Sequence, residues 1–147
     1  PALIGVYYRV RTDALWRTRD VLLSHGGGPR VHLVSDGAGN WSDAQSGDDL
    51  PALAGCLDVD IGLTPATNTL PIRRLDLAQG ETAVLRVVFL PPHTSDPGPR
   101  VMAQSYTCQK PGTKYRYHGV DSDFTADLEV DARGLVLDYP ETFRRLD

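Results

Sequence analysis

Apolar and polar residues alternate with a period of two along most of the chain, as in strands that bury one face. In residues 124–131 the apolar positions that share a face are Phe124, Ala126, Leu128 and Val130. Because such runs recur at short intervals with Gly- and Pro-rich turns between them, the pattern predicts an all-β sheet, barrel or sandwich. The other predicted strands are 4–10, 30–35, 56–61, 84–90, 100–109, 114–118 and 135–139.

The segments between these runs predict turns and little helix. Residues 36–40 (D-G-A-G-N) are typical of a hairpin turn, and the Pro-rich segment 91–99 of an exposed hairpin loop. Residues 131–134 predict another turn, and residues 13–20 fit a turn or an edge strand anchored by Leu15 and Trp16.

Two short helices are predicted. The first opens near Asn68 and ends at Gly80, with Pro71 at an early position and an apolar stripe of Ile72, Leu75 and Leu77. The second covers residues 140–146, with Phe143 and Leu146 pointing inward.

Composition indicates one globular domain, residues 1–147, with 41% hydrophobic and 23% charged residues. The net charge of −4 gives no electrostatic case for binding nucleic acid or anionic lipid surfaces. Without an apolar run of the roughly 18 residues that span a bilayer, and without a secretory signal, we expect a cytoplasmic protein with no transmembrane segment. A signal ahead of Pro1 remains an alternative.

Motifs for metals, nucleotides and nucleophilic catalysis are absent from the sequence. The four histidines lack metal-ligand spacing, and no serine lies in a GxSxG elbow. Cys56 and Cys108 fit reduced core residues, with a single disulfide as the alternative. We therefore predict no metal and no cofactor.

The segment from Gly55 to Leu75 carries the most unusual chemistry. Period two places Cys56, Asp58 and Asp60 on one face of a strand, and Leu57, Val59 and Ile61 on the other. The two carboxylates fit an acid–base pair, a hard-cation site, or structural partners for Arg73 and Arg74. The two arginines could instead bind a phosphate or sugar headgroup, and Asn68 and Thr64 could tie this irregular segment to its own backbone.

A second cluster is rich in tyrosine. Met102, Gln104, Tyr106 and Cys108 share a face of one strand, and Tyr115 and Tyr117 follow on the next. Tyrosine has an apolar ring and a polar tip, which suits the mouth of a pocket for an amphiphile. Cross-strand aromatic packing explains the same pattern without a ligand.

The string G-C-L-D-V-D-I-G-L-T-P-A-T-N-T-L-P-I-R-R-L at residues 55–75 resembles the signature of the putative glycolipid-binding family of bacterial proteins. Supporting segments extend the resemblance over nearly the whole chain: Tyr8–Val10, Gly39–Trp41, Gln104–Thr107, Tyr115–Tyr117 and Gly134–Pro140.

This resemblance implies an antiparallel sheet curled into an unclosed half-barrel with one or two short helices. Such a fold is similar to that of the bacterial lipoprotein carriers, whose concave face holds acyl chains, and it implies a lipid or glycolipid partner. Family members begin with a further strand pair ahead of Ala2, so the domain is expected to lack that pair. Another chain could supply the missing wall, and a homodimer is left open.

Three hypotheses follow. The preferred one is a binding protein that holds an amphiphile on its concave sheet, against Val6, Val88, Leu128 and Val130. The ligand-binding residues it predicts are Asp58, Asp60, Asn68, Arg73, Arg74, Gln104, Tyr106 and Tyr117. The alternatives are a small hydrolase or isomerase that acts on an amphiphile through Asp58 and Asp60, and a protein-interaction scaffold that pairs through an exposed sheet edge.

Overall fold

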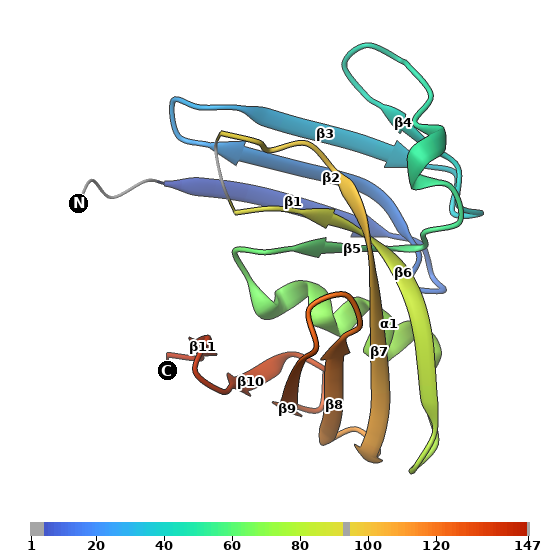
Figure 1. Ribbon diagram of the computed structural model, residues 1–147, viewed down its shortest axis with the longest axis vertical. Helices are drawn as coiled ribbons and strands as arrows, with labels where there is room; N and C mark the ends of the chain where they lie inside the picture. The colour runs from blue at the N-terminus through green and yellow to red at the C-terminus, as the bar shows by residue number, and fades with distance from the viewer. Residues whose placement is uncertain (1–4, 93–94, 147) are drawn as a thin grey trace.

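Two β-sheets make up the fold, which Figure 1 shows as a computed structural model. The structure describes residues 5–92 and 95–146. Sheet A has the strand order β1-β2-β3-β4, and sheet B has the order β11-β10-β9-β8-β7-β6-β5. The strands are β1 (Val6–Thr12), β2 (Thr18–His25), β3 (Arg30–Ser35), β4 (Trp41–Asp43), β5 (Asp58–Ile61), β6 (Thr82–Leu90), β7 (Arg100–Lys110), β8 (Lys114–Gly119), β9 (Phe124–Val130), β10 (Val136–Tyr139) and β11 (Phe143–Arg144).

Sheet B curls into the open half-barrel that the family resemblance implies (Figure 1). Its neighbours pair antiparallel except β5 and β6, which run parallel. A parallel pair needs a crossover, and here the 3₁₀-helix η2 (Pro65–Asn68) and helix α1 (Thr69–Leu75) supply it. The expectation of a mainly β half-barrel is confirmed, whereas the parallel pair was not foreseen.

Sheet A is wholly antiparallel and contains a strand that the period-two pattern did not reveal. In β2 the three consecutive residues Val21, Leu22 and Leu23 are all buried, so this strand lacks alternation. The turn before it passes through Trp16, whose φ of 64° lies in the left-handed region. The hairpin predicted at residues 36–40 does join β3 to β4.

One predicted helix forms but ends early, and the other predicted helix is wrong. Helix α1 ends at Leu75, because Asp76 takes a left-handed conformation with φ 45°, and it does not continue to Gly80. The second predicted helix is wrong: residues 143–144 form strand β11 instead. Leu146 is 87% exposed and does not point inward. A short 3₁₀-helix, η1 (Pro51–Leu53), precedes β5.

Segment 91–99 joins β6 to β7, which pair antiparallel as the predicted hairpin requires. His93 and Thr94 lie outside the described residues, as does Ile4 of the first predicted strand. No helix in the described part of the chain is long and apolar enough to cross a membrane.

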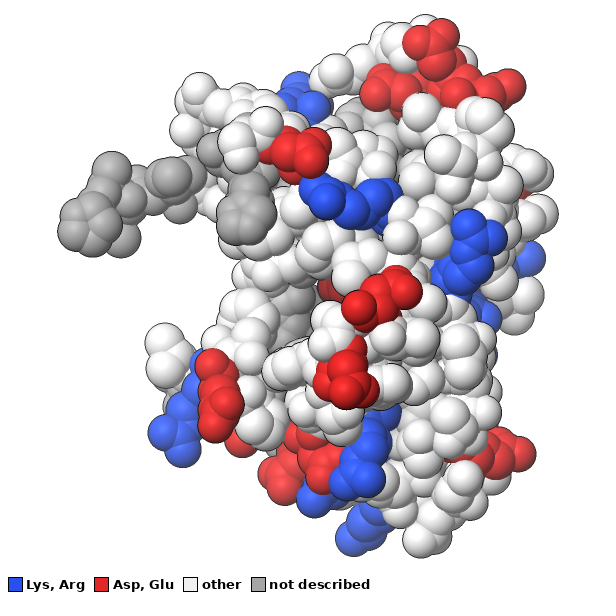
Figure 2. Space-filling model, in the orientation of Figure 1, with Lys and Arg blue, Asp and Glu red and all other residues white. Residues whose placement is uncertain are grey.

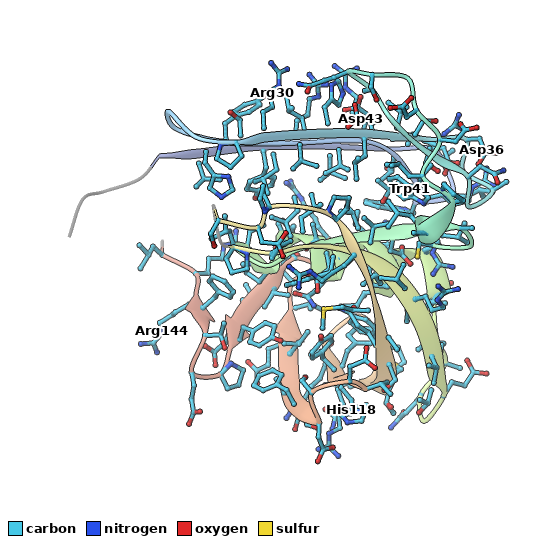
Figure 3. All side chains as sticks on the ribbon, turned by 45° about the horizontal axis from the view of Figure 1, so that its top comes forward. Arg30, Asp36, Trp41, Asp43, His118 and Arg144 are labelled. Carbon is cyan, nitrogen blue, oxygen red and sulfur yellow. The ribbon has the colours of Figure 1, made fainter. Side chains whose placement is uncertain are left out.

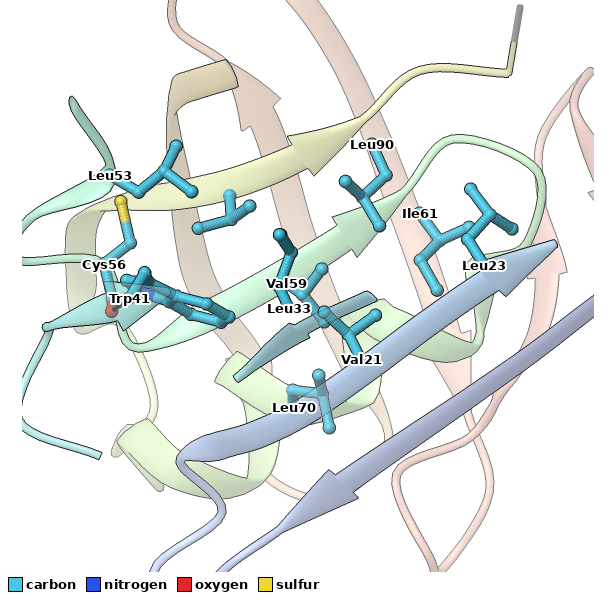
Figure 4. Packing of buried hydrophobic residues seen from close by; sticks show 11 residues of the cluster. Val21, Leu23, Leu33, Trp41, Leu53, Cys56, Val59, Ile61, Leu70 and Leu90 are labelled. Carbon is cyan, nitrogen blue, oxygen red and sulfur yellow. Dashed lines mark hydrogen bonds between the residues drawn. The ribbon is translucent and has the colours of Figure 1, made fainter. Parts of the chain in front are cut away.

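One hydrophobic core lies between the two sheets. Here side chains of β2 and β3 face those of β5 and β6, and Trp41 lies between the sheets with its indole donating to the Cys56 carbonyl at 2.9 Å (Figures 3 and 4). Cys56 therefore packs on the same side as Val59 and Ile61, which corrects the predicted alternation. This inter-sheet core consists of Val21, Leu23, Leu33, Trp41, Leu53, Cys56, Val59, Ile61, Leu70, Val88 and Leu90.

A second core fills the concave face of sheet B. Helix α1 contributes Ile72 to it and Leu70 to the inter-sheet core, so the helix joins the two. This inner core consists of Ile72, Tyr106, Cys108, Tyr115, Tyr117, Ala126, Leu128, Val130, Val136 and Tyr139.

The inner core corrects the predicted lipid surface. Leu128 and Val130 are buried at 0% and 4% exposure beneath α1 and the tyrosine rings, so they cannot face an acyl chain. Val88 belongs to the inter-sheet core, and Val6 lies on β1 in sheet A. The four residues therefore do not share one concave surface.

Candidate functional site

A cavity of about 250 Å³ opens where the end of β5, the η2 segment and the C-terminal strands meet. We call it the Asp60 cavity. It is smaller than the roughly 300–1,000 Å³ of pockets that enclose a drug-sized ligand, so its size suits a headgroup and not a whole lipid. Its lining consists of Asp60, Ile61, Gly62, Thr64, Pro65, Asn68, Phe89, Pro92, Tyr117, Ser122, Phe124, Tyr139, Thr142 and Phe143.

The half-buried carboxylate of Asp60 supplies the charge of this cavity. It accepts a hydrogen bond of 2.6 Å from Gln104 Nε2 and one of 3.4 Å from Thr67 Oγ1, both neutral donors. Burial raises the pKa of the Asp60 carboxyl above its ordinary value, although these two hydrogen bonds act in the opposite direction. Within the described residues, no Lys, Arg or His lines the cavity or opposes this rise.

Buried polar side chains of β7 hold two cavity residues in place through hydrogen bonds. Gln104 is 1% exposed and reaches Asp60 from β7. Two residues along the same strand, Tyr106 accepts a hydrogen bond of 2.8 Å from Asn68 Nδ2, and burial raises the Tyr106 pKa well above its ordinary value. This bond holds the start of α1 against the sheet. It also orients the Asn68 amide, which lines the cavity.

Aromatic rings form a wall of the cavity that contains Asp60. Tyr117 packs against Phe124 and Tyr139 with ring centroids 6.2 and 6.3 Å apart, and Tyr139 meets Phe143 edge to face at 6.1 Å. Burial and the nearby charge of Asp60 raise the pKa of Tyr117 to about 12, so its hydroxyl keeps its proton at neutral pH. The rings come from β8, β9, β10 and β11, strands that are consecutive in the sheet.

Gly62 lets the loop after β5 approach Phe89 and Pro92, which also line the cavity. A Cβ atom at this position would lie 3.0 Å from Pro92 Cδ and 3.2 Å from two carbons of the Phe89 ring. Thr64, in the same loop, caps η2 by accepting a hydrogen bond of 3.2 Å from the Ala66 amide, as its sequence position suggested. Its hydroxyl also meets Tyr8 of sheet A at 3.2 Å, so the cavity rim is tied to both sheets.

The predicted site residues separate into two groups. Asp60, Asn68 and Tyr117 line the cavity, and Gln104 and Tyr106 hold the first two in place. The Tyr106 and Tyr117 rings also make the cross-strand contact of the alternative interpretation, at 5.5 Å between centroids. The roles of these five residues in binding stay a prediction.

The other three predicted residues, Asp58, Arg73 and Arg74, lie away from the cavity. Arg74 donates to both carboxylate oxygens of Asp58, at 3.1 and 2.6 Å, and Asp58 is 1% exposed. Arg73 lies over the Trp16 ring, 5.0 Å from its centroid. Asp58 and Asp60 therefore have different partners and do not form a shared acid–base pair.

Charged side chains of both signs lie on the described surface outside the Asp60 cavity. On the face seen in Figure 2 the acidic and basic side chains are interspersed, with acidic residues gathered over the loops around β4. A more open depression of about 430 Å³ lies beside Leu15, Arg17, Arg73 and Arg74. Two of its arginines have carboxylate partners, since Arg17 pairs with Asp13 at 2.7 Å and Arg74 with Asp58, and Arg73 lies over the Trp16 ring. Among the described residues no three His, Cys, Asp or Glu side chains gather as metal ligands.

Sequence reasoning missed much of the aromatic wall. Tyr139 and Phe143 of the wall, and Phe89, which lines the cavity from β6, lie at or near strand ends, where a period-two pattern carries little information. Phe124 was placed on an inward face, yet it is 43% exposed at the cavity mouth. The one available signal was the density of aromatic residues between 115 and 143, which the tyrosine cluster captured only in part.

Comparison with known proteins gives two matches. A family model described as Putative glycolipid-binding matches residues 1–145. Among solved structures, the chain is similar to the crystal structure of a DUF1089 family protein from Pseudomonas aeruginosa, with 42% identity and a TM-score of 0.90 over 97% of this chain and 78% of that chain. No curated protein matches the chain.

Proposed function

The chain belongs to the putative glycolipid-binding family, and on this premise we propose that it binds a glycolipid by holding one sugar ring of the headgroup in the Asp60 cavity. The observation that carries the proposal is the pairing of a carboxylate acceptor with an aromatic wall in one cavity. A sugar ring presents hydroxyl donors at its rim and C–H groups on its faces. Asp60 suits the hydroxyls, and Tyr117 and Tyr139 suit the apolar faces.

The acyl part of the ligand remains outside the cavity in this proposal. The concave face is filled by the inner core, and a cavity of about 250 Å³ leaves no room for a long chain. Phe124 is 43% exposed, and it and the partly buried Phe143 both line the cavity, so the mouth offers apolar surface. The chain of the amphiphile would leave over these rings.

Calorimetric titration with n-octyl β-D-glucoside, below its micelle concentration, tests this function. We expect saturable binding to the native protein and its loss in Ser122→Trp, because Ser122 is an exposed lining residue and the indole would occupy the mouth. The matched control is Ser46→Trp in the exposed loop after β4, which should bind normally. Equal binding by both variants, or no binding by the native protein, would contradict the proposal.

A second candidate function is catalysis on an amphiphile, with Asp60 as a general acid. The observation that favours it is the raised pKa of a carboxyl that lines a cavity, since catalytic acids need such a shift. Asp58 cannot act as its partner, because Arg74 binds it outside the cavity. Hydrolysis of a fluorogenic glycoside that is lost in a folded Asp60→Asn variant would support catalysis, and unchanged turnover in that variant would contradict it.

Four further expectations from the sequence stay predictions. These are a cytoplasmic location, a homodimer, a scaffold role through a sheet edge and the likeness to lipoprotein carriers.

A further inference from the structure

The charge of the Asp60 carboxylate determines which class of headgroup fits the cavity. Asp60 receives hydrogen bonds from Gln104 and Thr67, and a carboxylate offers about four lone-pair positions, so acceptor capacity remains. The titratable groups that face it are the tyrosines Tyr106, Tyr117 and Tyr139, which are neutral at ordinary pH. Within the described residues nothing near Asp60 supplies a compensating positive charge.

The aromatic wall adds to this preference for a cation. The faces of aromatic rings carry negative potential and attract ammonium groups within about 6 Å of the centroid. Tyr117, Tyr139 and Phe124 lie within 6.1 to 6.3 Å of one another along the cavity wall. A cation next to Asp60 would therefore interact with both the carboxylate and the rings, in surroundings that are partly shielded from water.

Anionic headgroups meet the opposite situation. A phosphate, sulfate or carboxylate in this cavity would lie beside Asp60 without a Lys or Arg from the lining to pair with it. Arg73 and Arg74 lie in the last turn of α1, at Trp16 and Asp58, whereas the cavity lies at Asn68, where the helix begins. Among anionic, neutral and cationic headgroups, the cavity therefore disfavours the anionic ones. Asp60 still has acceptor positions with which it can bind a cationic one.

We propose that the headgroup selected by the Asp60 cavity carries a protonated amine on a polyhydroxylated ring, as in an amino sugar, with the amine bound at Asp60. The hydroxyl and amide groups of Thr64, Asn68, Ser122 and Thr142 around the cavity suit the ring hydroxyls. This inference rests on the proposed function, since it names the class of headgroup that the same site takes. A neutral sugar would offer Asp60 hydroxyl donors but no opposite charge.

Calorimetry with two matched detergents tests the inference. The probes are n-octyl β-D-glucoside and its 2-amino-2-deoxy analogue, at about pH 7, where an amine with a pKa near that of an α-amino group (~8) is mostly protonated. We expect the amino analogue to bind about tenfold more tightly, a gain typical of one charge-assisted contact. The advantage should disappear in Asp60→Asn, which keeps an oxygen acceptor for Gln104.

The outcomes separate the inference from the function on which it rests. Equal affinity for the two probes, or an advantage that survives in Asp60→Asn, would overturn the amine preference and leave headgroup binding intact. Failure of both probes to bind would overturn headgroup binding and the inference with it. A third probe, n-octyltrimethylammonium, distinguishes the sources of a positive charge: if it binds as well as the amino analogue, charge alone is recognised and the amino-sugar assignment falls.

Folding of Asp60→Asn is checked separately, so a loss of binding is not mistaken for unfolding. The variant should keep the near-ultraviolet circular dichroism of the inner-core tyrosines. It should also unfold in urea in one cooperative transition with a native-like slope, which an unfolded protein cannot show.

Discussion

Asp58 and Asp60 lie two residues apart on the same face of β5, yet Asp58 accepts a 2.6 Å hydrogen bond from the Arg74 guanidinium and Asp60 a 2.6 Å hydrogen bond from the neutral Gln104 amide. One carboxylate is part of an ion pair beside α1, and the other faces a cavity without a basic partner. An uncompensated charge in partly buried surroundings lowers stability. Such a cost is typical of a site that is shaped for a ligand.

Asp60→Asn should therefore stabilise the free protein at neutral pH. Burial raises the pKa of Asp60 in the folded state, so the stability that this group provides is present below its ordinary pKa and is lost as pH rises through the folded value. We expect the substitution to raise the free energy of unfolding by on the order of 1 kcal/mol at pH 7 and to have little effect at about pH 4. Urea unfolding across this range measures both.

Asp127→Asn is the control of opposite sign. Its hydrogen bonds with Arg116, at 2.8 and 3.1 Å, lower the pKa of Asp127, so its contribution to stability is present above the ordinary carboxyl pKa and is lost as pH falls. The pair is partly exposed, so the loss should stay below about 0.5 kcal/mol. If Asp60→Asn instead lost stability at neutral pH, Asp60 would be a structural residue.

Arg74→Leu should destabilise the protein by about 3 kcal/mol at pH 7. The substitution leaves the Asp58 carboxylate, which is 1% exposed, without its cation. Burial already raises the pKa of Asp58 against the effect of Arg74, so its protonation at about pH 5 should recover part of the loss. Arg73→Leu is the matched control, because exposed Arg73 contacts Trp16 and no carboxylate, and it should cost less than about 1 kcal/mol. Similar losses at both positions would contradict the assignment.

Phe124→Ala should weaken binding of n-octyl β-D-glucoside about tenfold with a small effect on stability. The ring is 43% exposed at the cavity mouth, so its removal takes contact surface from the ligand and leaves the inner core largely intact. Val84→Ala, at a position 71% exposed on β6, is the control and should bind normally. An unchanged dissociation constant in Phe124→Ala would place the ligand elsewhere.

Cys56 and Cys108 should react slowly with a thiol reagent in the native protein. Both are free and fully buried, and burial raises the pKa of each thiol, so little reactive thiolate is present at neutral pH. We expect two thiols to appear in urea and almost none without it. Rapid labelling of the native protein would show that one of the cores opens readily.

Much of sheet B could be predicted from the sequence, because its strands alternate. Residues 124–130 show this best, since Ala126, Leu128 and Val130 are buried in the inner core. Strand β2 was missed because its three consecutive buried residues leave no period to detect. The C-terminal strand β11 was mistaken for a helix. It has only two residues, too few for a strand pattern, and it forms because it pairs with β10.

The candidate site was predictable only in part, for a physical reason. The alternation of β5 correctly placed Asp58 and Asp60 on one face, but it carried no information on what each carboxylate meets. That depends on the crossover through α1, which brings Arg74 to Asp58, and on β7, which brings Gln104 to Asp60. The sequence also could not show that Arg73 and Arg74, predicted to bind a headgroup, lie in the last turn of α1 against Trp16 and Asp58.

The central claim is that the Asp60 cavity is the ligand site, and chemical-shift mapping tests it most directly. In a titration of the labelled protein with n-octyl β-D-glucoside, the aromatic ring signals of Tyr117, Phe124 and Tyr139 should shift together in a saturable way. The indole N–H signals of Trp16 and Trp41, which line other depressions, should stay in place. Shifts confined to Trp16 and its neighbours, with the three cavity rings unchanged, would contradict the account.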